Sequence, residues 1–210
     1  MKLLVLGTPR SRSNVVTDSL AKFYNIPNLA EPYLNLMDDM NYVGRVEQLT
    51  NVLLKKQDFV CKLQSTNISI NPLDAYTQFQ FNVYDGIYIT SRENIVDQIA
   101  SLIVANTNNT WAYYLKNPTP IMFVQTEHMY LLGELETDIK KINILKNQLI
   151  KDNIVIETLY YETSEEWINN NLNNATTEFE KSNYNYKKII SNYNELDDVV
   201  SRYFEKFESL

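Results

Sequence analysis

The chain has 210 residues, a formal net charge of −7 and a sequence pI of about 4.8, and its length suffices for one domain with a full core. An acidic chain does not present the broad basic face that nucleic acids require, so we expect no nucleic-acid partner. A single cysteine and a single histidine exclude an intramolecular disulfide and a metal site built from several such ligands. No apolar run is long enough for a signal peptide or a membrane span, which predicts a cytoplasmic protein without a membrane partner.

The first predicted element is a short apolar strand at residues 2–7. It runs into the turn Thr8-Pro9-Arg10-Ser11-Arg12, and apolar residues at helical spacing then predict a helix at about 13–24. A turn at the N-terminus of a helix directs backbone N–H groups toward one point, and two arginines add positive charge there. The stretch therefore predicts a site for a small anion near the start of the chain.

The rest of the chain alternates between helix and strand patterns. After a loop at about 25–40, the predicted elements are a helix at 41–56, a strand at 59–63, a short helix at 73–80, a strand at 86–90, a helix at 93–106, a helix at 126–151, a strand at 154–160 and a helix at 194–208. Residues 169–186 are polar and rich in Asn, which predicts a surface excursion. This order predicts an α/β fold, with three α/β/α layers around a mainly parallel sheet of four or five strands, in one domain over residues 1–210.

The first turn departs from the common phosphate loop of nucleoside-triphosphate enzymes, G-x-x-x-x-G-K-S/T. Counted from Gly7, Arg12 stands at the second glycine, Ser13 at the lysine and Asn14 at the hydroxyl residue that binds Mg²⁺. The chain therefore lacks the lysine that reaches the phosphates and the hydroxyl that holds the metal. These losses argue against a kinase or another NTPase of that type.

The same turn resembles a different phosphate loop. Pro9-Arg10-Ser11-x-Ser13 matches the P-R-S-G-S/T-T turn of sulfotransferases, enzymes with a P-loop type of nucleotide-binding fold. In that family the turn binds the phosphosulfate end of 3′-phosphoadenosine 5′-phosphosulfate. Arg12 replaces a glycine, and its second cation would either strengthen anion binding or obstruct the donor; Asn14 replaces a threonine. The resemblance implies a donor-binding set in the turn: Thr8, Pro9, Arg10, Ser11, Arg12, Ser13 and Asn14.

A second motif follows the strand at 86–90. The residues from Arg92 to Ser101 read R-x-x-x-V-x-Q-x-x-S, which resembles the bacterial trehalose 2-sulfotransferase-type family, and residues 105–111 are a loose echo of its A-x-x-T-x-x-W segment. The resemblance implies that Arg92 and Ser101 hold the 3′-phosphate of the donor. Tyr160-Tyr161-Glu162 is similar to the Y-E-x-L element of that family, which we interpret as structural.

Helical spacing gives an independent reading of the same segment. Asn94, Gln98 and Ser101 stand at i, i+4 and i+7, which predicts a polar stripe turned away from the apolar side of the helix. The stripe would start at the carboxyl end of a strand, where open α/β sheets bind their ligands.

The second strand carries the candidate for leaving-group stabilisation. Many sulfotransferases end this strand in Lys-Thr-His, and the matching residues here are Lys62-Leu63-Gln64. Lys62 is retained, and a lysine that closes a buried strand needs an anion or a water-filled cleft. Gln64 cannot accept a proton from a hydroxyl near neutral pH, so the histidine-based mechanism is absent from that position.

The general base therefore has to come from elsewhere. The resemblance to the trehalose-type family implies that the base is a carboxylate in the loop after the first helix. Glu31 is the matching residue in this chain. His128 is a rival base, although its position near the start of a long helix favours a structural or an exposed side chain.

The resemblance implies sulfuryl transfer from 3′-phosphoadenosine 5′-phosphosulfate to a hydroxyl of a small molecule or carbohydrate, with Arg10, Lys62 and Glu31 as catalytic residues and no metal. One alternative is a small-molecule kinase on the same fold. Another is a catalytically degenerate, sulfotransferase-like binding protein, which the departures at Arg12, Asn14 and Gln64 suggest. The sequence does not indicate the acceptor or the oligomeric state.

Overall fold

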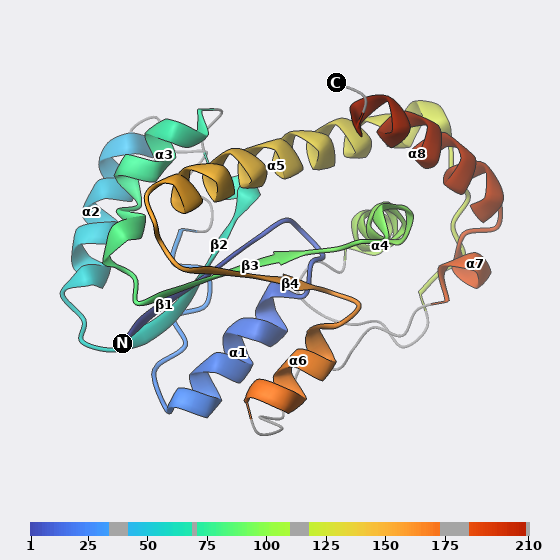
Figure 1. Ribbon diagram of the computed structural model, residues 1–210. Coiled ribbons are helices and arrows are strands. Elements are labelled where there is room, and N and C mark those ends of the chain that lie inside the picture. The colour runs from blue at the N-terminus through green and yellow to red at the C-terminus, as the bar shows by residue number, and fades with distance from the viewer. Residues whose placement is uncertain (34–41, 69–70, 110–117, 173–184, 209–210) are drawn as a thin grey trace. The chain divides into compact units, whose positions relative to one another are not determined.

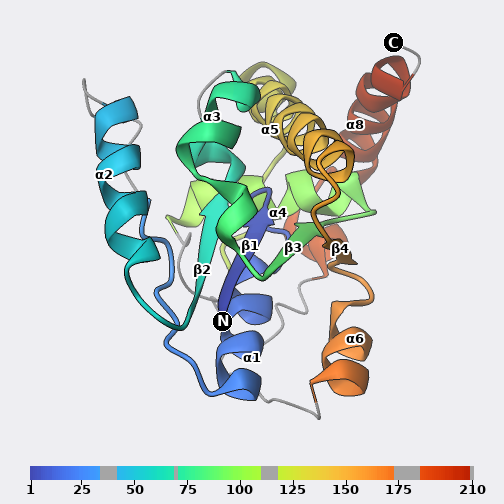
Figure 2. The same cartoon turned by 60° about the vertical axis from the view of Figure 1, so that its left-hand side comes forward.

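A central parallel sheet organises the chain (Figures 1 and 2). The computed structural model describes residues 1–33, 42–68, 71–109, 118–172 and 185–208. These residues form an α/β fold whose four-stranded sheet is parallel throughout and has the order β2-β1-β3-β4. Its strands are β1 (Lys2–Gly7), β2 (Phe59–Gln64), β3 (Gly86–Ser91) and β4 (Ile156–Tyr160). The predicted fold class is confirmed.

Helices connect and follow the strands. They are α1 (Ser13–Tyr24), α2 (Tyr42–Leu54), α3 (Pro72–Gln78), α4 (Ile95–Asn108), α5 (Gln125–Lys151), α6 (Ser164–Asn171), α7 (Tyr186–Ile189) and α8 (Tyr193–Glu208). Short 3₁₀ turns lie at Ser65–Asn67 and Phe81–Val83. The six helices predicted from periodicity are present within a few residues of their expected bounds. We missed α6 and α7 because they are too short for a helical period to stand out in the sequence.

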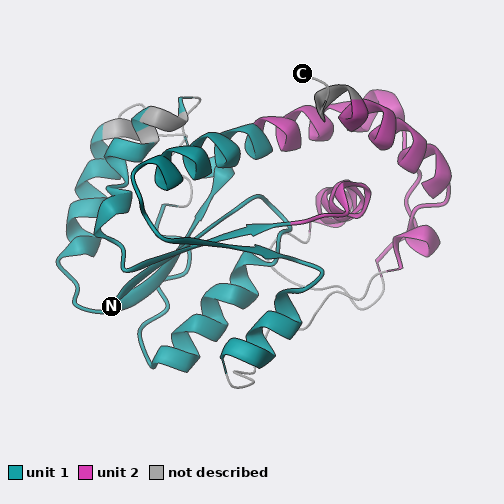
Figure 3. Cartoon of the chain, viewed as in Figure 1, with its two compact units in different colours: residues 1–91, 138–179 teal, residues 92–137, 180–210 magenta. Residues whose placement is uncertain are grey.

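The chain divides into two compact units (Figure 3). Unit 1 comprises residues 1–91 and 138–179 and contains the sheet. Unit 2 comprises residues 92–137 and 180–210, and α5 contributes to both units. The assignment of residues 1–210 to one domain stays a prediction.

Unit 1 has three layers because successive strand residues face opposite sides of the sheet. On one face, Leu3 and Val5 of β1 pack with α1 and α6. On the other face, Leu4 and Leu6 pack with α2, α3 and the part of α5 that belongs to this unit. Apolar burial on both faces explains why the middle of β1 is a continuous apolar run.

Unit 2 is helical in the part that the structure describes. α4 packs against α7 and α8. Side-chain hydrogen bonds join segments of this unit that are distant in the sequence. Asn192 accepts from the N–H of Phe123 and donates to its carbonyl, and Tyr193 donates to Asp97 over 2.8 Å.

Gly7 ends β1 where the side chains of Thr90 and Ser11 approach the backbone closely. A Cβ added there would lie 2.1 Å from Thr90 Oγ1 and 2.8 Å from Ser11 Oγ. We expect Gly7→Ala to lower the free energy of unfolding by about 1–3 kcal/mol, because extra volume in a packed site forces its neighbours apart. Urea unfolding followed by circular dichroism measures this change.

Gly133, in α5, provides the matched control. A Cβ there would come no closer than 4.0 Å to Tyr203 Oη. Gly133→Ala is expected to raise the free energy of unfolding by about 0.5–1 kcal/mol, because alanine favours the helix over glycine. Equal effects of the two substitutions would contradict the close approach at Gly7.

Candidate functional site

The candidate site lies at the carboxyl edge of the sheet in unit 1. Gly7 is in register with Gln64 of β2 and with Thr90 of β3, so the ends of three strands meet there. β1 lies between β2 and β3, so the chain passes to one side of β1 to form β2 and then crosses to its other side to form β3. In open α/β sheets, this change of direction leaves a crevice at the carboxyl ends of the strands, where ligands bind.

The turn after β1 has an unusual backbone. Arg10 and Arg12 have φ values of 63° and 69°, in the left-handed region, and Arg12 is the N-cap of α1. Left-handed residues in a turn are typical of the backbone nests that bind anions, and the first N–H groups of a helix have no partner within the helix. The observed geometry therefore suits the small anion that the sequence predicts.

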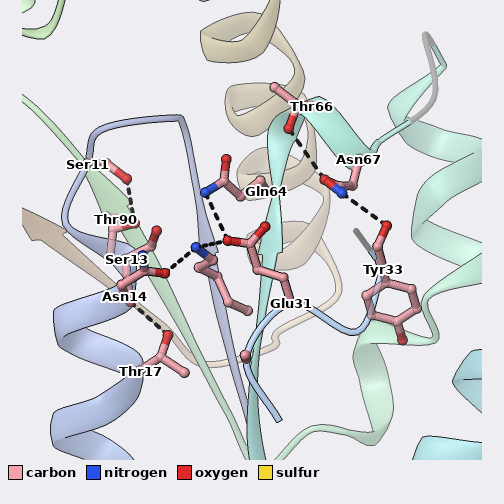
Figure 4. Close-up of polar contacts among 12 residues, drawn as sticks. Ser11, Ser13, Asn14, Thr17, Glu31, Tyr33, Gln64, Thr66, Asn67 and Thr90 are labelled. Carbon is pink, nitrogen blue, oxygen red and sulfur yellow. Dashed lines mark hydrogen bonds and ion pairs between the residues drawn. The ribbon is translucent and has the colours of Figure 1, made fainter. Parts of the chain in front are cut away.

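Ser11 fastens this turn to the sheet. Its hydroxyl donates to the carbonyl of Thr8 over 2.6 Å and lies 2.8 Å from Thr90 Oγ1 (Figure 4). Because the single proton of Ser11 goes to Thr8, the hydroxyl of Thr90 donates to Ser11. In this structure Ser11 shapes the turn, and its predicted hydrogen bond to the donor stays a prediction. Thr90 is a site residue that our sequence reasoning missed.

Arg12 adopts the conformation that a glycine would adopt more easily. A left-handed residue with a Cβ costs about 1–2 kcal/mol, and glycine avoids this cost. The side chain of Arg12 is 9% exposed, and its Nη1 lies 3.1 Å from Ser164 Oγ and 3.7 Å from Glu165 Oε2. The guanidinium also lies over the ring of Tyr161, at 5.8 Å from its centroid. The β4–α6 turn therefore holds this side chain.

Lys62 is the centre of a polar cluster beside the start of α1. It belongs to β2 and its side chain is only 2% exposed. The ammonium forms an ion pair with Glu31 Oε1 and donates to Asn14 Oδ1. Since an ammonium can only donate, Asn14 must present its oxygen to Lys62, which leaves the NH₂ group of Asn14 as a donor. The sequence-based expectation that Lys62 needs an anion is met by Glu31.

The chain before Glu31 runs alongside β2. The N–H of Val60 donates to the carbonyl of Pro27, and the N–H of Leu29 donates to the carbonyl of Val60, both over 2.9 Å. The N–H of Lys62 then donates to the carbonyl of Ala30 over 2.7 Å. These bonds tie the chain up to Ala30 to β2 and thereby bring Glu31 next to Lys62.

Burial and charge act against each other at Lys62. Burial lowers the pKa of Lys62 below its ordinary value of 10.5, and the carboxylate of Glu31 opposes the shift. The side chain of Glu31 is 23% exposed, so it is the more accessible member of the pair. Gln64, the residue at the position of the missing histidine, places its Nε2 at 3.5 Å from Glu31 Oε1 (Figure 4). Gln64 thus acts as a donor toward the candidate base.

The residues assigned to the 3′-phosphate lie in unit 2. Arg92 has a side chain that is 5% exposed, with Nη2 at 3.8 Å from Asp97 Oδ2 and its guanidinium at 5.9 Å from the ring centroid of Tyr186. Ser101 is 2% exposed and Gln98 is 1% exposed. Both are buried, so these two members of the polar stripe expected on α4 do not face solvent, whereas Asn94 is exposed. Asn94, the first member of the stripe, caps α4 by accepting from the N–H of Asp97.

Two further predicted residues have clear places. Ser13 is buried, and its carbonyl accepts from Thr17 Oγ1 over 2.7 Å. His128 is buried and stacks on Phe123, with its Nδ1 at 3.0 Å from the N of Val124. This position supports the structural interpretation of His128. Trp111, from the loose A-x-x-T-x-x-W echo, lies outside the described residues.

Neither a metal-binding cluster nor a membrane-spanning helix is present within the described ranges. In that part of the chain, no three His, Cys, Asp or Glu side chains gather closely enough to hold a metal ion. No helix within it is both long and apolar enough to cross a membrane.

A scan against protein-family models gives no match to this chain, and no curated protein sequence matches it.

Proposed function

We propose that this protein is a sulfotransferase that moves a sulfuryl group from 3′-phosphoadenosine 5′-phosphosulfate to a hydroxyl of a small molecule or carbohydrate. One observation carries the proposal. Glu31 and Lys62, which the resemblance assigns to proton removal and to the leaving group, form an ion pair at the carboxyl edge of the sheet. Asn14, from the first turn of α1, joins the same ammonium.

The proposed step balances as a direct displacement. The acceptor oxygen attacks sulfur, the bond between sulfur and the 5′-phosphate oxygen breaks, and the acceptor proton passes to the carboxylate of Glu31. The leaving group is 3′-phosphoadenosine 5′-phosphate. Charge on its phosphate oxygens would be stabilised by Lys62, Arg10 and the N–H groups at the start of α1, as in phosphoryl transfer.

This chemistry requires the Glu31–Lys62 pair to separate. An anionic oxygen of the donor would replace the carboxylate at Lys62, because a buried ammonium must keep a partner. Glu31, the more exposed member, would then turn to the acceptor hydroxyl. Donor binding would therefore release the base, which predicts that the donor binds before the acceptor reacts.

The 3′-phosphate distinguishes this donor from other adenine nucleotides. The assignment of that phosphate to Arg92 and Ser101 rests on the sequence resemblance. A buried arginine supplies the fixed, bidentate donors that suit a phosphate.

Calorimetry with 3′-phosphoadenosine 5′-phosphate, adenosine 5′-phosphate and ADP tests the proposal. We expect 3′-phosphoadenosine 5′-phosphate to bind at least about tenfold more tightly than adenosine 5′-phosphate, because charged hydrogen bonds contribute about 1.5–3 kcal/mol. Arg92→Ala should remove most of that difference. Arg202→Ala, which removes an exposed arginine paired with Asp198, should keep it.

The other outcomes point to the alternatives. Preference for ADP would favour the kinase, and binding of none of these nucleotides would favour the degenerate interaction protein. Equal affinity of the parent and Arg92→Ala for the 3′-phosphorylated nucleotide would show that Arg92 does not read the phosphate. Transfer of labelled sulfate from the donor to a panel of hydroxyl compounds would then identify the acceptor class.

A further inference from the structure

The guanidinium of Arg12 joins the first turn to the turn between β4 and α6. Nη1 of Arg12 reaches Ser164 Oγ at 3.1 Å, and the guanidinium packs over Tyr161. Ser164 Oγ donates to the carbonyl of Tyr161 over 3.0 Å, so its lone pairs face the arginine. We name the group formed by Arg12, Tyr161, Ser164 and Glu165 the Arg12 clamp.

The clamp is fixed at both ends. The N–H of Tyr161 donates to the carbonyl of Ser91 over 2.8 Å, which ties the β4–α6 turn to the end of β3. At the other end, the carbonyl of Arg12 accepts from the N–H groups of Val15 and Val16, at 3.1 and 3.3 Å. The backbone of Arg12 thus sets the first turn of α1, and its side chain anchors that backbone to the edge of the sheet.

We propose that Arg12 is a positioning residue, which holds the anion-binding turn in its left-handed conformation through the Arg12 clamp. The inference rests on the proposed function, because it assigns the turn to the phosphosulfate. The side chain is nearly buried, its charge lies near Glu165, and Nη1 is used by Ser164. Arg10 remains the cation that the resemblance assigns to the donor itself.

The clamp explains why position 12 of the turn tolerates a residue other than glycine. Glycine reaches the left-handed region freely and also leaves it freely. Arginine has to be held there, and the contacts of the clamp supply the hold. The departure at Arg12 therefore exchanges a flexible turn for one that is preorganised before the anion arrives.

Hydrogen exchange tests the conformational part without any ligand. Arg12→Gly and Ser164→Ala should each speed exchange at the amides of Val15 and Val16, relative to the amides of β1. Arg202→Gln removes a positive charge from an exposed position in α8 and should leave those amides unchanged. Unchanged exchange in both clamp variants would overturn the proposal, whether or not the protein binds the donor.

A double-mutant cycle tests the effect on binding. Arg12→Gly and Ser164→Ala should each weaken binding of 3′-phosphoadenosine 5′-phosphate by about five- to tenfold, the lower range of coupling between linked groups. The double variant should bind no more weakly than Arg12→Gly alone, because both changes break one clamp. Ser164→Ala keeps the test usable if Arg12→Gly fails to fold.

The outcomes separate the two proposals. Weak binding by Arg12→Gly together with parental binding by Ser164→Ala would make Arg12 a direct ligand and overturn its positioning role. Absence of binding in the parent would instead overturn the proposed function, and the exchange experiment would still decide the clamp.

Discussion

Glu31→Gln should lower the turnover of sulfuryl transfer by a factor of about 10²–10⁴, the usual contribution of a general base. The same variant should bind 3′-phosphoadenosine 5′-phosphate at least as tightly as the parent. In the parent, the carboxylate of Glu31 occupies the ammonium of Lys62 and competes with the incoming anion. Glutamine cannot take the proton, and it removes the competing charge while keeping the shape.

Two measurements on one preparation check this result. Steady-state transfer of labelled sulfate gives the turnover, and calorimetry gives the affinity. Glu134→Gln makes the same chemical change at an exposed position of α5 and should match the parent in both. Unchanged turnover in Glu31→Gln would remove Glu31 as the base. Weaker nucleotide binding would contradict the competition at Lys62.

Lys62→Met should lower turnover by about 10²–10³, the cost of losing one donor to a developing charge. It also removes a buried charge, and this has a signature in stability. Burial lowers the pKa of Lys62 in the folded state, so between that pKa and 10.5 the unfolded chain holds the proton more firmly. The contribution of Lys62 to stability therefore rises with pH across this window and is lost in the variant.

Urea unfolding of both proteins from pH 7 to pH 10.5 measures the difference. The free energy of unfolding of the parent, minus that of Lys62→Met, should increase as the pH rises. Lys22→Met, at a side chain that is 41% exposed and paired with Asp18, should give a flat difference and parental turnover. A flat difference for Lys62→Met would show that Lys62 is not desolvated in the folded protein.

The three residues that depart from the sulfotransferase pattern, Gln64, Asn14 and Arg12, each have defined side-chain contacts. Gln64 lies within 3.5 Å of the carboxylate of Glu31, so the position of the missing histidine still faces the candidate base. Asn14, in place of a threonine, binds the ammonium of Lys62. Arg12 is held by the β4–α6 turn. Gln64 and Asn14 therefore belong to the polar cluster around Lys62, and Arg12 belongs to a separate set of contacts with the β4–α6 turn.

The order of the elements and the turn at residues 8–12 could be predicted from the sequence because both are local properties. Apolar runs and helical periods predicted four strands and six helices, since the spacing of apolar residues within one element shows which of its sides is buried. A turn followed at once by a helix predicts an anion site for the same local reason. The need of Lys62 for an anion also followed from its place at the end of a buried strand.

Only the tertiary structure decided which groups meet. The pairing of Glu31 with Lys62 depends on residues 27–30 running beside β2, and no local pattern encodes that alignment. The link from Arg12 to Ser164 depends on the β4–α6 turn lying beside the first helix, although the two are far apart in the sequence. Likewise, Gln98 and Ser101 have the spacing of a polar stripe, yet packing buries them. Periodicity shows which side of one element is apolar, whereas long-range contacts depend on how separate elements pack against one another. That packing determined which residues form the candidate site.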